Sequence, residues 1–331
     1  MENKTSSFLT MTASPHIKSP IKTKNIMSDV IIAMIPMLIW SVYVFGFRAL
    51  TITAISVISS VLFEYLYRKL MKKSNTISDL SAVVTGILLA FCLPVSVPLW
   101  IPVVGAFFAI VIVKQLYGGI GKNVVNPALA ARVFLFIAYP ADVSNYIKTD
   151  AVKLNPFAMS VDVTEQIKAG ATPLNNLKEG VMPESSIVST FIGDIPGCIG
   201  EISATIIILS GAFLLLRKVI SWHIPVSFIA TVALVSLIFP QGQMSGVDFM
   251  LYQLFSGGLM IGAFFMATDY VTCPVTKNGK LIYGVGCGLL TVLIRYFGAF
   301  PEGVSFAILI MNLFVWYLDK ATKPKVFGGV K

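Results

Sequence analysis

Long apolar runs separated by short polar segments dominate the chain, and ten of these runs approach the length of a membrane-spanning helix. At 1.5 Å per residue, a helix needs about 20 residues to cross the hydrocarbon core of a bilayer. The predicted spans are residues 27–46, 50–67, 79–96, 98–117, 125–142, 198–216, 224–240, 249–268, 281–298 and 303–319. The pattern therefore predicts an all-α, polytopic membrane protein with about ten transmembrane helices.

One long polar interval, from about Asp142 to Glu184, separates five predicted spans from the other five. Because five is an odd number, duplicated halves would have opposite orientations in the membrane. A weak repeat of proline and glycine positions supports two inverted five-helix repeats. The predicted division is an N-terminal segment 1–26, a first repeat 27–142, a loop 143–197, a second repeat 198–319 and a tail 320–331.

The composition agrees with a membrane protein and excludes a soluble domain. The chain is 56% hydrophobic and only 12% charged, whereas soluble domains have about 25% charged residues. Of its 25 lysines and arginines, 18 lie in the segments that the predicted spans place on the same side of the membrane as the N-terminus. The positive-inside rule therefore predicts that both termini are cytoplasmic and that the 143–197 loop lies on the outer face. Basic residues confined to short loops do not indicate a nucleic-acid partner.

The cysteines and histidines do not form a metal-binding motif. No two of the four cysteines have C-x-x-C spacing, and the chain has only two histidines. A metal site built by this chain alone is therefore not expected, and a cluster shared with another subunit remains an alternative. The residues concerned are Cys92, Cys198, Cys273, Cys287, His16 and His223.

Ionisable residues within or beside the spans are candidate functional groups, because a charge at the bilayer centre costs about 2.5–3.5 kcal/mol. Arg132 follows a helix start at Asn126-Pro127 and should either pair with an intramembrane carboxylate or cofactor oxygen, or extend to the interface. Glu64 is expected to pair with Arg68 one turn later. The candidates for a cation path are Glu201 and Asp269.

Thr172 is the candidate modification site in the polar interval. The residue before a proline avoids the helical region, so Thr172 should be extended, and Gly170 permits a tight turn just before it. This setting predicts an accessible hydroxyl on a short loop. An ordinary Thr-Pro turn is the alternative.

Several motifs, in order along nearly the whole chain, resemble the D subunit of the Rnf complex and the related B subunit of sodium-pumping NADH:quinone oxidoreductase. Gly170-Ala171-Thr172-Pro173-Leu174 resembles the flavin-attachment motif of that family, although Ala169 occupies a position that is usually Ser or Thr. The other matching stretches are residues 116–132, 196–201, 266–274 and 296–304. The fold implied is similar to that of urea transporters.

The resemblance implies that Thr172 carries FMN through a phosphoester and that the flavin passes electrons between subunits. It also makes Gly170, Ala171, Asn126 and Arg132 candidates for contacting the flavin, and a non-covalent riboflavin is a further expected cofactor. The implied complex, with A, B, C, E and G type subunits in the bacterial cytoplasmic membrane, couples ferredoxin oxidation and NAD reduction to Na⁺ or H⁺ export. The chain lacks a strand followed by G-x-G-x-x-G, so we expect NAD and ferredoxin to bind other subunits.

Two other functions are compatible with the composition and the spans. An inverted five-plus-five bundle without a flavin would suit a solute channel or transporter. A structural membrane anchor for redox partners is the third alternative.

Overall fold

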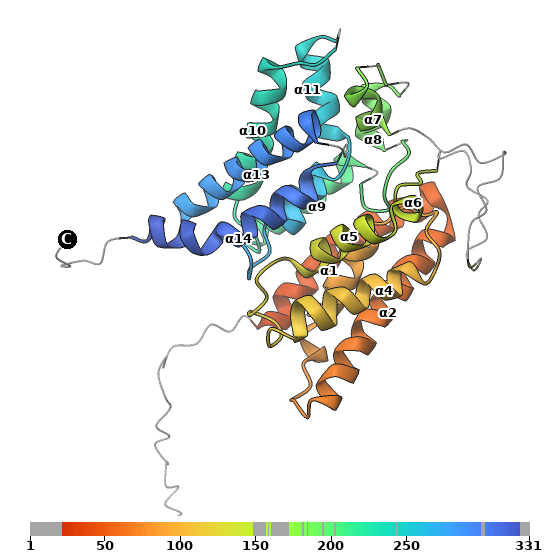
Figure 1. Cartoon of the computed structure of the whole chain (residues 1–331), viewed down its shortest axis with the longest axis vertical. Coiled ribbons are helices and arrows are strands. Elements are labelled where there is room, and N and C mark those ends of the chain that lie inside the picture. The colour runs from red at the N-terminus through yellow and green to blue at the C-terminus, as the bar shows by residue number, and fades with distance from the viewer. Residues whose placement is uncertain are drawn as a thin grey trace, which may run out of the picture.

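Helices form the regular secondary structure of the described residues (Figure 1). The structure is a computed structural model that describes residues 22–147, 157, 159, 172–180, 182–183, 185–193, 195–201, 203–242, 244–298 and 302–324. Gly170 and Ala171, which the sequence groups with Thr172, lie outside the described residues. The all-α prediction is confirmed for the described part.

The helices fall into two groups with two short helices between them along the chain (Figure 1). The first group is α1 (Thr23–Phe45), α2 (Phe47–Leu70), η1 (Ile77–Asp79), α3 (Ser81–Phe91), α4 (Ile101–Phe107) with its π-helical continuation η2 (Phe108–Gln115), α5 (Pro127–Ala138) and α6 (Pro140–Val143). The intervening helices are α7 (Pro173–Lys178) and α8 (Ile187–Ile192). The second group is α9 (Ala204–Leu216), α10 (His223–Ile238), α11 (Gly246–Phe255), α12 (Leu259–Ile261) with its π-helical continuation η4 (Gly262–Met266), α13 (Lys277–Phe297) and α14 (Val304–Thr322).

Every predicted span corresponds to a helix or a bent pair of helices, although not all are long enough to cross a bilayer. In the described part, α1, α2, α13 and α14 are long and apolar enough, and α11 with α12–η4 forms one further span bent by 62°. The others are shorter apolar helices; α3 has 11 residues, a length of about 16 Å. Half-length helices of this kind are tolerated at membrane depth where protein surrounds their ends.

The two groups meet through backbone hydrogen bonds between irregular segments. Ile199 N donates to Leu93 O at 3.0 Å and Gly200 N donates to Phe91 O at 2.9 Å. A Cβ at Gly200 would lie 2.4 Å from the Phe91 Cβ, so only glycine allows this approach. The turn before α9 therefore donates two backbone hydrogen bonds to carbonyls at the end of α3.

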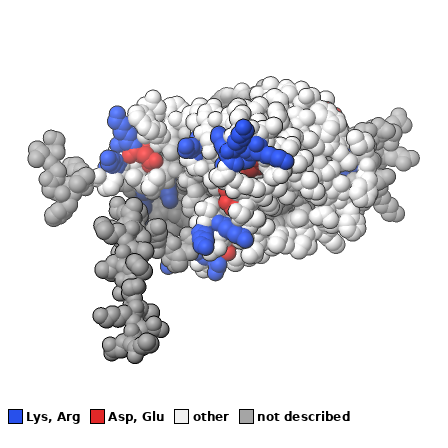
Figure 2. All heavy atoms as spheres, turned by 90° about the horizontal axis from the view of Figure 1, so that it is seen from below, with Lys and Arg blue, Asp and Glu red and all other residues white. Residues whose placement is uncertain are grey.

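The lysine and arginine side chains gather in separate groups on the face shown in Figure 2.

Arg48, near the start of α2, is buried and donates to the carbonyls of Val95 (2.8 Å) and Val97 (2.9 Å). It thereby stabilises the hairpin between α3 and α4, which contains Pro94 and Pro98. Arg48 is therefore an internal structural residue of the first group of helices.

Candidate functional site

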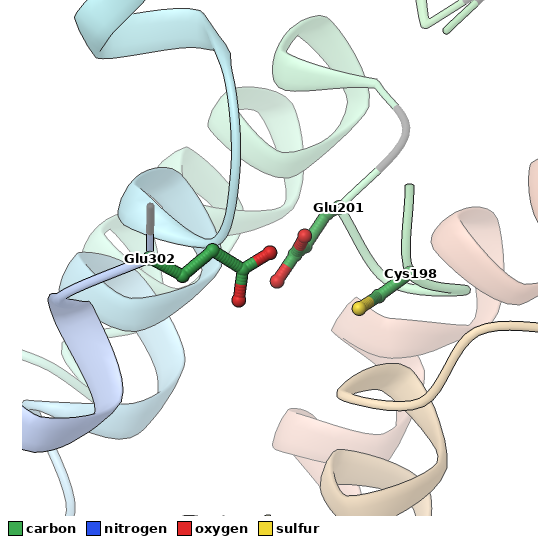
Figure 3. A group of neighbouring side chains, drawn as sticks. All are labelled: Cys198, Glu201 and Glu302. Atoms are coloured by element: carbon green, nitrogen blue, oxygen red, sulfur yellow. The ribbon is translucent and has the colours of Figure 1, made fainter. Parts of the chain in front are cut away.

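A buried ionic cluster joins the middle of α5 to the starts of α9 and α14. Arg132 on α5 donates from Nη1 to Glu201 Oε1 at 3.0 Å and from Nη2 to Glu302 Oε2. The exposed fractions of the Arg132, Glu201 and Glu302 side chains are 7%, 4% and 15%. Figure 3 shows Glu201 and Glu302 pointing toward each other from different segments, with Cys198 beside them. We call Arg132, Glu201, Glu302 and Cys198 the Arg132 cluster.

The sequence positions this cluster through helix starts. The Asn126 side chain caps α5 by accepting from Ala128 N (3.0 Å) and Leu129 N (3.4 Å), and Pro127 occupies the first turn. Both features favour a helix start, and they place Arg132 nearly two turns inside α5. Glu201 lies just before α9, and Glu302 lies just before α14. The three charges therefore come from distant parts of the chain.

Two carboxylates share one guanidinium in this cluster. The ligand atoms of Cys198, Glu201 and Glu302 lie within 4.8 Å of one another, and the Tyr146 hydroxyl donates to Glu302 at 3.3 Å. Buried charges need opposite charges and hydrogen bonds. The arrangement can therefore hold a proton, or a hard cation that prefers carboxylate oxygen.

Thr172 is the N-cap residue of the short helix α7. Its backbone is extended (φ −68°, ψ 151°), and its hydroxyl accepts from Asn175 N at the long distance of 3.4 Å. The extended conformation confirms the effect of Pro173. The prediction of an accessible hydroxyl is wrong for this conformation, because Thr172 is only 8% exposed.

Leu174 of α7 and Glu201 of the Arg132 cluster both adjoin the bend between α11 and α12. Leu174, two residues after Thr172, reaches the bend between α11 and α12: a Cβ at Gly257 would lie 2.4 Å from Leu174 Cδ1. A Cβ at the adjacent Gly258 would lie 2.7 Å from Glu201 Oε1. The bend therefore adjoins both Leu174 and Glu201, and its two glycines permit these close approaches.

Arg295 holds this bend in place. Its Nη1 donates to the carbonyl (2.6 Å) and side-chain oxygen (2.7 Å) of Gln253, and its Nη2 donates to Ser256 O at 3.3 Å. A cation at the C-terminal end of a helix is favoured by the helix dipole. Arg295, which is 3% exposed, thus satisfies carbonyls that the broken span leaves without helical partners.

A cavity of about 230 Å³ lies between the two groups of helices. Its mostly apolar wall includes Phe265 of η4, and its polar lining groups include Asn126, Lys114 of η2 and Asp269. Asn126 Nδ2 donates across the groups to Met266 O at 3.1 Å. Both π-helical segments therefore contribute to one cavity, and such segments are frequent at functional sites.

The comparisons with known proteins agree with this architecture. The model of the NQR2, RnfD, RnfE family matches residues 10–328. The chain belongs to this family. It is 44% identical, over 98% of the chain and 96% of the relative, to the D subunit of a Na⁺-translocating ferredoxin:NAD⁺ oxidoreductase complex from Acetobacterium woodii. It is 37% identical, over 96% of each chain, to the D subunit of a proton-translocating ferredoxin:NAD⁺ oxidoreductase complex from Clostridium ljungdahlii.

Within this family member, the structure separates the two carboxylates that the sequence proposes for a cation path. Glu201 belongs to the Arg132 cluster, whereas Asp269 lines the cavity and accepts from Thr272 Oγ1 at 3.0 Å. Burial raises the pKa of the Asp269 carboxyl, and the bond from Thr272 opposes that shift. Asn126 reaches the cavity and Arg132 reaches the cluster, so the residues predicted to contact a flavin also divide between two places.

The sequence interpretation missed two partners. Glu302 lies one residue before the last predicted span, so it was not considered as an intramembrane charge. Glu64 accepts from Lys114 Nζ at 2.7 Å, while Arg68 Nη1 donates to Ser74 O at 3.1 Å. The predicted Glu64–Arg68 pair is therefore replaced by a pair between α2 and η2. For Arg132, pairing with a carboxylate is confirmed and extension to the interface is wrong.

Proposed function

We propose that this chain is the membrane-embedded electron-carrying subunit of an Rnf-type ferredoxin:NAD⁺ oxidoreductase that exports Na⁺ or H⁺. The match to the A. woodii protein over 98% of the chain carries this proposal. Ferredoxin and NAD would bind other subunits of the complex, which resemblance suggests are of the A, B, C, E and G types. The chain would have both termini in the cytoplasm and Thr172 toward the outer face of the cell membrane.

Thr172 is the proposed attachment residue for FMN, whose ring would supply electron transfer. Its hydroxyl fits this role because its bond from Asn175 N is long, at 3.4 Å, and therefore leaves the oxygen weakly engaged. The chain's part would be to hold the tether at the start of α7 and to keep it beside the bend through Leu174. Because Thr172 is 8% exposed, FMN attachment requires that Thr172 become accessible. Either the structure around it opens locally, or the modification precedes folding.

The cavity between the helix groups is the proposed place for the second, non-covalent flavin. Apolar walls with a few polar groups are typical of cofactor sites. Asn126 and Lys114 would orient polar edges of such a ring, and Phe265 would contact its face. Lys114 already bonds Glu64 and Ser81 Oγ (2.6 Å), so its position is fixed.

Glu201 and Asp269 are the proposed stations for the exported ion, now with Glu302 beside Glu201. With one guanidinium for two carboxylates, a proton or cation that enters the Arg132 cluster would compete with Arg132 for the same oxygens. The relatives' names specify Na⁺ in one organism and protons in another. The choice of ion therefore varies within the family and requires measurement in this protein.

The flavin proposal is tested on the chain produced with its flavin transferase. We expect in-gel flavin fluorescence after denaturation and an FMN-sized mass increase on the peptide containing Thr172. Thr172→Ala should abolish both signals, and Thr164→Ala, from the same polar interval, should keep them. An unmodified, non-fluorescent wild-type chain would refute the attachment and favour the solute-carrier alternative.

The ion proposal is tested on the intact complex by measuring ferredoxin:NAD⁺ activity and ion uptake into inverted vesicles with and without Na⁺. Glu201→Gln and Asp269→Asn should lower the number of ions moved per electron pair. Glu179→Gln, which changes an exposed carboxylate, should leave this ratio unchanged. Unaltered ratios in both test variants would exclude these carboxylates from the path.

A further inference from the structure

We propose that an open groove beside α10 and α13 binds the anionic headgroup of a phospholipid. The groove has a volume of about 510 Å³. It is lined by Leu215, Lys218, Ser221, Trp222, Tyr270 and Lys280, among others. We call it the Lys218–Lys280 groove. It lies apart from the Arg132 cluster and does not depend on the function proposed above.

The charge of the groove favours an anion. Two lysines line it, and none of the described residues that line it is acidic. Asp29 is the acidic residue whose charge acts on Tyr270 of the groove. Its carboxylate accepts two hydrogen bonds from Arg217 Nη2, at 3.0 and 3.1 Å, so it is already paired with a cation. Neither Lys218 nor Lys280 forms an ion pair with a described residue. Their two positive charges are therefore available to a ligand.

A helix terminus adds to this preference. Helix α10, of 16 residues, begins at His223 directly after the groove residues Ser221 and Trp222, and no side chain caps its first turn. Uncapped amide N–H groups and the positive end of the helix dipole both favour a negative group.

The surroundings of the groove favour an amphiphile over a free anion. Leu216 is 83% exposed, and Val226 and Ile282 are 50% and 49% exposed. These apolar side chains lie within four residues of the groove residues Leu215, Trp222 and Lys280 along the chain. Trp222 itself is 53% exposed, and tryptophan concentrates at membrane interfaces. A headgroup on the lysines would thus have its acyl chains beside exposed apolar surface.

The location also supplies the ligand. The lysine distribution assigns this end of the molecule to the cytoplasm, where the membrane surface carries anionic lipids. Each lysine near such a surface strengthens the binding of anionic lipid about 5-fold. Removing both charges should therefore weaken binding by about 25-fold.

The test uses the intact complex in mild detergent, supplemented with phosphatidylglycerol or with phosphatidylcholine. Native mass spectrometry measures how much of this subunit, ejected from the complex, retains lipid. The test variant is K218Q/K280Q. The matched control is K320Q/K323Q, which removes the same charge from the end of α14.

We expect the wild type and the control to retain phosphatidylglycerol in preference to phosphatidylcholine, and the K218Q/K280Q variant to need about 25-fold more lipid for equal occupancy. Equal retention of the two lipids, or an equal loss in the control, would overturn the proposal. Displacement of the lipid by an equal concentration of inorganic phosphate would show recognition of a free anion instead. A wild-type complex that retains neither lipid would also overturn the proposal.

Discussion

The shared guanidinium of the Arg132 cluster leads to a direct test by Arg132→Gln. This change leaves Glu201 and Glu302 facing each other without the cation that contacts both. Glutamine retains part of the side-chain volume and can donate one hydrogen bond to either carboxylate. The main effect is therefore the loss of charge compensation in a buried site.

The expected cost follows from the burial of these groups. Removing one partner of a buried ion pair costs about 3–5 kcal/mol. For a chain of 331 residues, the average unfolding entropy converts this cost into a fall in the unfolding temperature of about 4–7 °C. The triple variant R132Q/E201Q/E302Q removes the stranded charges and should recover most of that loss.

The measurement is thermal unfolding of the purified protein in detergent, followed by tryptophan fluorescence. Arg217→Gln is a matched control, because Arg217 also lies 3.0 Å from a carboxylate, that of Asp29, but its side chain is 58% exposed. An exposed pair contributes at most about 1 kcal/mol, so the control should shift the midpoint by less than about 1.5 °C. Equal shifts in the two variants would refute the reasoning. A triple variant no more stable than Arg132→Gln would show that packing, and not charge, sets the cost.

Three further predictions concern other parts of the structure. Gly257→Ala should lower the unfolding temperature more than Gly121→Ala, because both have positive φ (+69° and +86°) but only the Cβ at 257 would meet a neighbour, Leu174 Cδ1 at 2.4 Å; equal losses would exclude the contact. Arg48→Lys should destabilise the protein by about 2–3 kcal/mol in thermal unfolding, because an ammonium cannot reproduce the two bonds of a guanidinium; a wild-type midpoint would contradict this. Burial raises the pKa of the Cys273 thiol, in the loop before α13, to about 11; since the thiolate is the reactive form, its alkylation should be about 100-fold slower at pH 8 than for a thiol of pKa 9 and should accelerate up to pH 11, as followed by peptide mass spectrometry.

The positions of the helices could be predicted from the sequence because apolar runs report membrane burial directly. Each of the ten predicted spans corresponds to a helix or a bent pair. Their lengths could not be predicted in the same way, because residues at membrane depth stay apolar whether they are helical or not. The run 79–96, for example, contains an 11-residue helix, α3, followed by irregular backbone whose polar groups bond the turn before α9.

The chemistry of the site was predictable only one residue at a time. The Asn126-Pro127 start and the intramembrane charge identified Arg132, but its partners come from 69 and 170 residues away in sequence. No periodicity relates such positions. The packing of α7 could not be predicted either, because Leu174 and Leu177 pack against Phe249 and Tyr252 of α11, which lie more than 70 residues away in sequence.

The bend between α11 and α12 adjoins Leu174, two residues after the proposed attachment residue Thr172, and also adjoins Glu201 of the Arg132 cluster. Leu174, two residues from Thr172, meets it at Gly257, and Glu201 meets it at Gly258. Transfer of free energy between two sites requires an element whose arrangement both sites bias. Arg295 holds this bend through the carbonyls of residues 253 and 256. If the proposed electron transfer and ion movement are coupled within this chain, the bend is placed to link them through Leu174 and Glu201, and loss of Arg295 should then alter the ion-to-electron ratio while Thr172 and the carboxylates remain in place.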